Sequence, residues 1–323
     1  MTIGPATAPV SSPASAPDIG PAIAPAIAPP IAPAINAWFL EHGRDLPWRD
    51  PDIDAWGILV SEVMLQQTQV ARVVPRLAQW LERWPTPAAL AASPPSEAVR
   101  AWDRLGYPRR ALNLHRAAVV ITEQHGGIVP SDVHALLALP GVGDYTARAV
   151  AAFAYGKRHP VVDTNVRRVL ARAIGGAAEA GPPSTRRDLA AMEAQLPIEA
   201  ADARLFNAAI MELGAIVCTA RSPRCLSEPD ACPIASACAW RGAGYPEYEG
   251  ARAASQKAFD GSDRQVRGLI MAELRASDVP VTAAELALVW PDAAQRDRAL
   301  DSLLADGLVV VVDGGGGFEL PGG

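Results

Sequence analysis

The chain has 323 residues, of which 50% are apolar, and a formal net charge of −6 at pH 7. This length and apolar content allow a large core and more than one domain, while the net negative charge excludes a DNA-binding surface that is basic throughout. No apolar run approaches the roughly 18 residues of a membrane span, and the N-terminus lacks the features of an export signal. We therefore expect a cytoplasmic protein without a membrane partner.

Prolines and alanines dominate residues 1–35, in repeated steps such as the Pro-Ala-Ile-Ala that begins at Pro21. Prolines at that density forbid a helix and favour a disordered, extended arm. Residues 36–241 have apolar residues at helical spacing and short turns built on Gly or Pro, most clearly at 55–84 and 111–125. No alternation typical of a strand occurs there, so we predict an all-α body.

The segment SEVMLQQT at residues 61–68 contains the first candidate for chemistry, Glu62. The apolar residues Val60, Val63 and Met64 flank this glutamate. Such neighbours predict a desolvated carboxyl with a raised pKa, which keeps a proton available near neutral pH. A surface glutamate on an amphipathic helix is the alternative, and it fits these apolar neighbours less well.

The segment LPGVGDYTA at residues 139–147 is predicted to join two helices through a tight turn. Gly141 and Gly143 allow the backbone to approach a neighbour closely, and the helix that follows offers unpaired N–H groups to an anion. We interpret this segment as the hairpin of a helix-hairpin-helix module, which binds phosphate without reading sequence. An ordinary turn between two helices is the alternative.

Asp163 directly precedes another predicted helix. As the N-cap it would accept hydrogen bonds from the amides of Asn165 or Val166, and the helix dipole would favour its charged form. A capping aspartate can also be purely structural. Two groups of basic residues lie near the hairpin in sequence and suit phosphate contact, although such runs are usually solvated helix faces: Lys157, Arg158, Arg167, Arg168 and Arg172, and Arg104, Arg109, Arg110 and Arg116.

The cysteines of the chain all lie in one segment, residues 218–238, with the spacing C-x6-C-x6-C-x5-C: Cys218, Cys225, Cys232 and Cys238. Four thiolates without a histidine can hold zinc or an iron–sulfur cluster. Zinc sites of this kind usually consist of two C-x2-C knuckles, which are absent, so the spacing favours a cluster. Two disulfides or four unrelated thiols are the alternatives, and disulfides need an oxidising compartment.

Residues 242–261 are rich in Gly, Ala, Tyr and Glu and are predicted to be a linker. Residues 262–323 show the element order of a winged helix, with helices at 263–275, 282–289 and 292–305 and strands at 308–312 and 318–320. Acidic side chains are at least as numerous as basic ones in this unit. A winged helix that reads DNA presents a basic recognition helix, so we expect this unit to pack on the body or on a protein partner and to contribute little to DNA affinity.

Six motifs occur in a fixed order along the chain: LPW at 46–48, SEVMLQQT at 61–68, LGY at 105–107, LPGVGDYTA at 139–147, VDTNV at 162–166 and ELGAIVC at 212–218. This order resembles the MutY family of adenine DNA glycosylases, in the helix-hairpin-helix, endonuclease III-like superfamily. The resemblance covers residues 36–241, and SEVMLQQT is its most discriminating motif. It implies a helix-hairpin-helix glycosylase body with a cysteine loop that holds a 4Fe–4S cluster.

The resemblance also implies a function and a set of site residues. The family extrudes and excises adenine paired with guanine or 8-oxoguanine in double-stranded DNA, so the protein would act as a monomer on such mismatches, associated with the nucleoid. Glu62 matches the acid that protonates adenine N7, and Asp163 matches the aspartate that stabilises the oxocarbenium-like sugar. Gln67 and Tyr107 match the DNA-binding residues of the family that wedge into the duplex beside the vacated base. Other matches are the supporting Tyr145 and Asn165, the DNA-binding Thr68, Gly141 and Gly143, and Trp48 and Arg49 in the base pocket.

Tyr145 separates this chain from the bifunctional members of the superfamily. Those members resemble LPGVGRKTA, in which a lysine forms a Schiff base and goes on to cleave the strand. Tyr145 stands at the lysine's position, which implies a monofunctional enzyme that leaves an abasic site.

Two departures from the family pattern stand out. The family's cluster spacing resembles C-x6-C-x2-C-x5-C, whereas Cys225 and Cys232 have six residues between them; such a lengthening costs little entropy. Residues 262–323 are too few for the Nudix-like domain that recognises 8-oxoguanine in many members. A glycosylase for another mismatch, such as thymine opposite guanine, and a non-catalytic iron–sulfur DNA-binding protein are the alternatives. The pair Glu62 and Asp163 argues against the second.

Overall fold

The computed structural model describes residues 30–251, 259–312 and 317–322. Its α-helices are α1 (Ala32–His42), α2 (Ala55–Leu65), α3 (Val70–Arg83), α4 (Pro87–Ala91), α5 (Pro95–Trp102), α6 (Arg109–Gln124), α7 (Val133–Leu137), α8 (Asp144–Phe153), α9 (Thr164–Ala173), α10 (Thr185–Glu193), α11 (Ala200–Ile216), α12 (Ala239–Gly242), α13 (Asp263–Ala276), α14 (Ala283–Val289) and α15 (Ala293–Ala305). The 3-10 turns and strands are η1 (Pro47–Arg49), η2 (Arg224–Leu226), η3 (Pro229–Ala231), η4 (Ala235–Ala237), β1 (Val310–Val311) and β2 (Phe318–Glu319). The body at residues 36–241 is fully described and contains no strand, which confirms the predicted all-α body.

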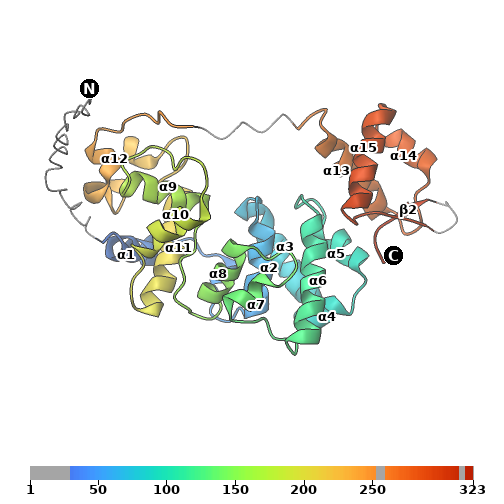
Figure 1. Cartoon of the computed structure of the whole chain (residues 1–323), viewed down its shortest axis with the longest axis horizontal. Helices are drawn as coiled ribbons and strands as arrows, with labels where there is room; N and C mark the ends of the chain where they lie inside the picture. Colours follow the sequence, from blue (N-terminus) through green and yellow to red (C-terminus); the bar gives the residue numbers. More distant parts are fainter. Residues whose placement is uncertain (1–29, 252–258, 313–316, 323) are drawn as a thin grey trace, which may run out of the picture.

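The body consists of two groups of helices, each around its own core (Figure 1). The first group, α2–α8, buries a large core built on Trp, Leu, Val and Ala side chains. The second group combines α9–α11 with α1, because α1 packs against α11. The N-terminal helix thus crosses to the far end of the body. Within the described ranges, none of the helices is both long and apolar enough to cross a bilayer.

α1 begins before the predicted end of the N-terminal arm. Pro33 lies in its first turn, where the missing N–H of proline costs no helical hydrogen bond. Ile31 and Ile35 are buried in the second core, and this burial stabilises the helix against the local proline content. The predicted disordered arm, residues 1–35, is therefore wrong for residues 32–35, which belong to α1. Residues 1–29 lie outside the described ranges.

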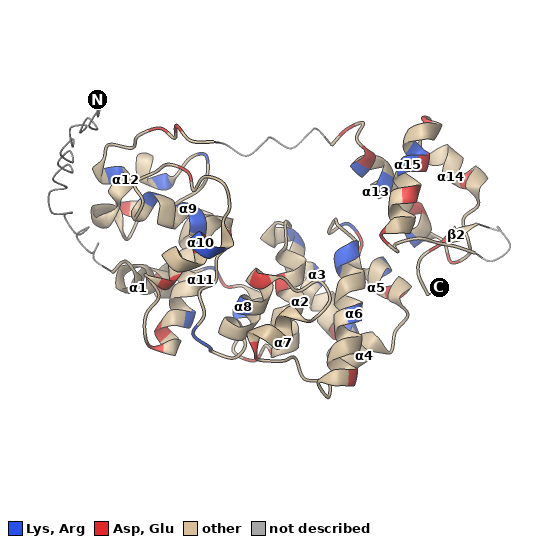
Figure 2. Ribbon diagram, in the orientation of Figure 1, with Lys and Arg blue, Asp and Glu red and all other residues tan. Residues whose placement is uncertain are grey.

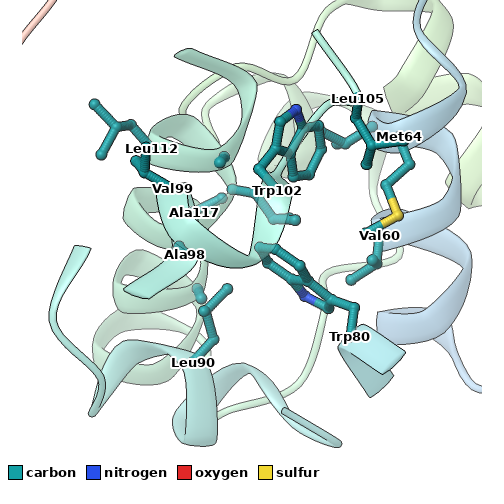
Figure 3. Close-up of a cluster of buried hydrophobic side chains, with 14 of the residues drawn as sticks. Val60, Met64, Trp80, Leu90, Ala98, Val99, Trp102, Leu105, Leu112 and Ala117 are labelled. Atoms are coloured by element: carbon teal, nitrogen blue, oxygen red, sulfur yellow. The ribbon is translucent and has the colours of Figure 1, made fainter. Parts of the chain in front are cut away.

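α2 is held by a cluster of aromatic side chains in the first core. Val60 and Met64 lie against Trp80 and Trp102 (Figure 3), whose rings meet edge to face at 5.6 Å. Residues two apart on a helix lie on nearly opposite faces. Glu62, between Val60 and Met64, therefore points away from this cluster and toward the second group of helices.

The C-terminal unit has the predicted order of elements. α13, α14 and α15 are followed by an antiparallel pair of short strands in which Val311 lies opposite Phe318, and Phe318 also pairs with Val281 in an isolated bridge. The predicted linker, residues 242–261, lies between α12, which ends at Gly242, and α13, which begins at Asp263; its residues 252–258 are outside the described ranges. The assignment of the unit as a winged helix stays a prediction.

The C-terminal unit packs on α5 and α6 of the first group. Arg100 donates hydrogen bonds to the backbone carbonyls of Arg275 and Ser277, and Arg109 forms an ion pair with Asp306 at 3.2 Å. The buried apolar residues of α13–α15 belong to the same core cluster as those of α2–α8. Acidic and basic residues are interspersed on these helices (Figure 2). The predicted packing of this unit on the body is confirmed.

Candidate active site

A cavity of about 690 Å³ lies between the two groups of helices, within the range of about 300–1,000 Å³ that small-molecule pockets occupy. Two predicted base-pocket residues, Trp48 and Arg49, and two predicted catalytic residues, Glu62 and Tyr145, line it. The other walls come from α1, α2, α8 and α11 and are mostly apolar, including Phe39, Ile58, Leu65, Phe153, Leu205, Ala208 and Met211. The cavity therefore has the size and lining to accept a flat aromatic ligand.

Glu62 is the buried acid of this cavity. Its helix is buried continuously from Trp56 to Met64, and the Glu62 side chain is almost completely enclosed. Burial raises its pKa to about 7; the hydrogen bond from the Tyr145 hydroxyl opposes this rise, and the neighbouring Asp163 adds to it. The second carboxyl oxygen, Oε2, has no hydrogen-bond partner among the described residues. The prediction of a desolvated carboxyl with a raised pKa is confirmed.

Asp163 is the N-cap of α9, as predicted. Its Oδ1 accepts a hydrogen bond from the Val166 amide at 2.7 Å, and its Oδ2 accepts one from the Asn165 side chain at 2.8 Å. Burial nevertheless raises the pKa of Asp163, because desolvation outweighs these donors. We expected capping and the helix dipole to favour the charged form of Asp163, and this expectation is wrong for the direction of its pKa shift. The two carboxyls differ instead in their hydrogen bonds: both oxygens of Asp163 accept one, whereas one oxygen of Glu62 accepts none from the described residues.

Arg168 holds Asn165, the residue whose side chain donates a hydrogen bond to Asp163. It donates to Asn165 Oδ1 at 2.7 Å, to the Gly214 carbonyl at 2.6 Å and, through Nε, to the Cys218 carbonyl at 2.7 Å. Gly214 is needed here because a Cβ at this position would lie 2.7 Å from the Asn165 Cβ. A single guanidinium thus connects the capping network to the start of the cysteine loop.

Glu212 is a functional candidate that the sequence did not single out. It is 1% exposed, and its carboxylate accepts hydrogen bonds from Arg44 at 2.6 and 2.9 Å and from Arg49 at 2.9 Å. Burial opposes ionisation, but these arginines more than offset it and hold the pKa below its usual range. Glu212 therefore fixes Arg49 in the cavity wall. Glu212, like Glu62, lies in a largely apolar helical segment. An acidic residue in such a segment was the signal by which the sequence could have identified it.

Gln67 and Tyr107, the two predicted wedge residues, share an unusual backbone conformation. Their φ angles are 57° and 48°, in the left-handed region that non-glycine residues rarely adopt. Tyr107 is 48% exposed. The Thr68 hydroxyl donates to the Leu105 carbonyl at 3.2 Å, so the loop after α2 and the turn before α6 are adjacent.

The hairpin glycines have different surroundings. Gly141 has φ 77°, and a Cβ there would lie 2.6 Å from the Asn113 side chain, which confirms the predicted close approach. Gly143 is the N-cap of α8, and a Cβ there would meet no atom of the described residues within 4 Å. The described residues supply no close neighbour at Gly143, so a close approach there stays a prediction. No side chain caps the first turn of α8.

The four cysteines line one small cavity together with Arg172, Val217, Ile234 and Trp240, and all four are free thiols. The additional residues between Cys225 and Cys232 form the short turns η2 and η3, which return the chain to the cavity. In the described part of the chain, no three metal-binding side chains converge on a point that could hold a single ion. All four cysteines nevertheless border one shared space.

Arg172 organises this loop. It is 4% exposed, donates to the Thr219 carbonyl at 2.7 Å, lies 3.4 Å from the Cys218 sulfur and stacks over Trp240 at 4.7 Å. A nearby cation favours a thiolate, but burial dominates at Cys225 and Cys232 and raises the pKa of both, to about 11 at Cys232. Four free thiols beside one cavity are still donors that suit a thiolate-bound metal group, whose binding would release their protons.

Most of the predicted phosphate-contacting arginines have internal partners. Arg167 pairs with Asp188 at 2.7 Å and Arg158 pairs with Glu193, while the guanidiniums of Arg168 and Arg172 bind backbone carbonyls. The phosphate-contact prediction is wrong for Arg110, which is buried. The basic residues near the hairpin thus stabilise the fold to a larger extent than their sequence pattern indicates.

Comparisons with known proteins agree with this site. Residues 60–193 match the HhH-GPD superfamily of base excision DNA repair proteins. An adenine DNA glycosylase of Mycobacterium tuberculosis is 56% identical over 288 residues, 88% of this chain and 92% of the relative. A solved thermostable thymine-DNA glycosylase has a TM-score of 0.60 and 29% identity over 66% of this chain and 95% of its own. Endonuclease III in a trapped covalent complex with DNA has a TM-score of 0.56 at 23% identity, over 67% of this chain and 95% of its own.

The fold and the buried carboxyls beside the cavity define a DNA glycosylase enzyme of the helix-hairpin-helix class. The match to endonuclease III shows the fold alone. Within this class, the chain belongs to the family of adenine DNA glycosylases.

The raised pKa of Glu62 predicts a stability change in the variant Glu62→Gln. Between the ordinary glutamate pKa and about 7, the unfolded chain ionises Glu62 while the folded protein keeps the proton, so wild-type stability falls as pH rises through this window. Glutamine cannot ionise. We expect the free energy of unfolding of Glu62→Gln to exceed that of the wild type by up to about 3 kcal/mol at pH 8, and by much less at pH 4.5. Urea denaturation at both pH values measures this, and equal stabilities at pH 8 would contradict it.

Proposed function

We propose that this enzyme removes adenine paired with 8-oxoguanine or guanine in double-stranded DNA, as a monomer. The main support is one arrangement: Glu62, a buried acid with a pKa of about 7, lines a base-sized cavity close to the hydrogen-bonded carboxylate of Asp163. Adenine is the base named for the relative at 56% identity. A flipped base needs such a cavity, because chemistry on a stacked base is sterically blocked.

In the proposed mechanism the two carboxyls have opposite roles. The protonated Glu62 donates its proton to adenine N7, so that the bond from C1′ to N9 breaks with its electron pair leaving on a neutral base. The hydrogen bonds to both oxygens of Asp163 favour its ionised form, although burial raises its pKa. As a carboxylate it would stabilise the positive charge that develops on the sugar. Water then adds to C1′ and leaves an abasic site.

The enzyme is proposed to be monofunctional. Strand cleavage in bifunctional glycosylases requires an amine that attacks C1′ to form a Schiff base. Tyr145 occupies the position of that lysine, and only two lysines occur in the chain, Lys157 and Lys257. Lys157 is exposed, next to Gly156 at the cavity wall.

The DNA duplex is proposed to contact the two loops and the hairpin on one side of the cavity. Gln67 and Tyr107 would enter the duplex beside the extruded adenine, supported by Thr68. The uncapped first turn of α8 after Gly143 would bind a backbone phosphate through its amides and helix dipole. Gly141 would keep this turn in place against α6.

A 4Fe–4S cluster is proposed for the cavity of the cysteine loop. Four cysteine thiolates without a histidine are the donor set that such clusters use, and Arg172 lies beside them. The cluster would fix Cys218, Cys225, Cys232 and Cys238 relative to α9 and α11. Its contribution here would be structural, because it would cross-link a loop that begins next to the Arg168 network.

The central experiment compares Glu62→Gln with wild type in single-turnover excision assays on duplexes with A:8-oxoG, A:G and T:G pairs. We expect wild-type excision of adenine from the first two and no excision of thymine. Glu62→Gln should bind the same duplexes yet lose about 10²–10⁴-fold or more in rate, since this is the usual contribution of general acid catalysis. Near-normal excision by Glu62→Gln would refute the acid's role. Preferred release of thymine would favour the alternative specificity for T:G mismatches.

The hydrogen bond from Tyr145 predicts a shift in the pH profile. This bond stabilises the ionised form of Glu62 and lowers its pKa, so Tyr145→Phe should raise the pKa further. Excision needs the protonated acid, and the wild-type rate should fall as pH rises above about 7. We expect the alkaline limb of the single-turnover profile to move to higher pH in Tyr145→Phe. A limb that stays in place, or moves down, would show that another group sets it.

Metal analysis of the purified protein tests the cluster. We expect about four irons per chain and little zinc, as the all-cysteine donor set implies. Cys225→Ser should lose iron, because Cys225 reaches the cavity only through the turn η2. One zinc per chain without iron would overturn the proposed cofactor, and the excision assay would then decide independently whether the active site functions.

A further inference from the structure

Arg110 is a buried arginine without a carboxylate partner among the described residues. It lies in the first turn of α6 and is 9% exposed. Burial lowers its pKa to about 10, which reflects the cost of placing a cation in the interior without a counter-ion. A protein retains such a group where its hydrogen bonds fix a conformation that apolar packing would not specify.

Every hydrogen bond of the Arg110 guanidinium leads to one of two loops. Nη1 donates to the carbonyls of three residues at the end of α2, and Nη2 donates to the Thr68 hydroxyl and to two carbonyls before α6. The distances are 2.9 Å to Val63, 3.0 Å to Met64 and 2.6 Å to Gln66 for Nη1, and 2.9 Å to Thr68, 3.2 Å to Leu105 and 2.8 Å to Gly106 for Nη2.

Arg110 contacts the residue directly before each of the two wedge residues, Gln67 and Tyr107. The carbonyl of Gln66 directly precedes Gln67, and the carbonyl of Gly106 directly precedes Tyr107. Because a guanidinium is planar and its two terminal nitrogens have a fixed separation, one side chain sets the distance between these two carbonyls. It therefore sets the distance between the two residues that follow them.

The wedge residues need such support because of their backbone conformation. Left-handed φ angles at Gln67 and Tyr107 cost of order 1–3 kcal/mol each and persist only where the surroundings fix them. Arg110 also lies between the rings of Trp102 and Tyr107, at 5.1 and 5.8 Å from their centroids. The guanidinium thus holds the Tyr107 ring as well as the turn before it.

We propose that Arg110 is the positioning residue that sets the separation of Gln67 and Tyr107 and ties both to the helix of the catalytic acid. The carbonyls of Val63 and Met64, which directly follow Glu62, complete this connection. The inference rests on the proposed insertion of Gln67 and Tyr107 into the duplex. Its consequence is that adenine extrusion and the preference for A:8-oxoG over A:G both depend on a side chain that touches neither base.

Arg110→Lys tests the inference in the full-length protein. Lysine keeps the charge but is a single compact donor that cannot bind both loops in a planar fork. The measurement is the fluorescence of 2-aminopurine placed next to the adenine of an A:8-oxoG duplex at saturating protein, followed by single-turnover excision. We expect a clear loss of the extrusion signal, a loss in rate of about 10- to 100-fold, since a displacement of about 1 Å can cost 10²-fold, and a narrower preference over A:G.

Arg109→Lys is the matched control, because Arg109 is the neighbouring residue and its guanidinium is more than half exposed, paired with Asp306. It should retain the wild-type extrusion signal. Thr68→Val is the milder second variant if Arg110→Lys does not fold, as judged by circular dichroism. It removes one acceptor of Nη2 and should reduce extrusion several-fold. If Arg110→Lys folds, a wild-type extrusion signal in that variant would overturn the inference. If it does not fold, a wild-type signal in Thr68→Val would do so.

The variant Gln67→Ala distinguishes a failure of the Arg110 inference from a failure of the proposed insertion of Gln67 and Tyr107 into the duplex, on which the inference rests. A reduced extrusion signal in Gln67→Ala together with a wild-type signal in Arg110→Lys would reject the role of Arg110 alone. A wild-type signal in both Gln67→Ala and Tyr107→Ala would reject the wedge function, and the positioning role of Arg110 with it. Reduced signals in all three variants, with an unchanged Arg109→Lys, are the expected result.

Discussion

The burial of the Glu62 carboxyl is the constraint on which the site depends. A carboxyl keeps a proton near neutral pH only if its ionised form is poorly solvated, and this requires a helix that is enclosed on all sides. α2 meets the requirement because Val60 and Met64 anchor it in the aromatic core and α8 packs against it. Residues of α1 and α11, which pack on each other, line the cavity that Glu62 faces.

Buried and half-buried arginines connect the segments that we propose to act on DNA. Arg110 binds the two loops beside the cavity, Arg168 binds the network of Asp163, and Arg172 binds the cysteine loop. Each uses several donors on backbone carbonyls, which the planar five-donor guanidinium allows and an ammonium does not. Many of the basic residues of the chain thus form hydrogen bonds inside the protein. A net negative charge and only two lysines are therefore compatible with an enzyme that acts on DNA.

The C-terminal unit occupies the side of the body next to the Tyr107 turn. Arg109, two residues after Tyr107, is paired with Asp306 of this unit. The alignment of 288 residues with the mycobacterial relative is longer than the part of the chain before the linker, so the relative shares part of this unit.

The sequence by itself determined the local features of this protein. Helical periodicity, the N-cap at Asp163, the glycine at 141 and the apolar neighbours of Glu62 are encoded within a few residues of each feature. The tertiary structure decided which of these features meet. Glu212 became a partner of Arg44 and Arg49, no described residue approaches Gly143 closely, and several of the arginines predicted to contact phosphate bind backbone carbonyls instead, namely Arg110, Arg168 and Arg172. Burial also raised the pKa of Asp163 against its cap. Desolvation and long-range hydrogen bonds depend on segments far apart in the chain, and no local pattern records them.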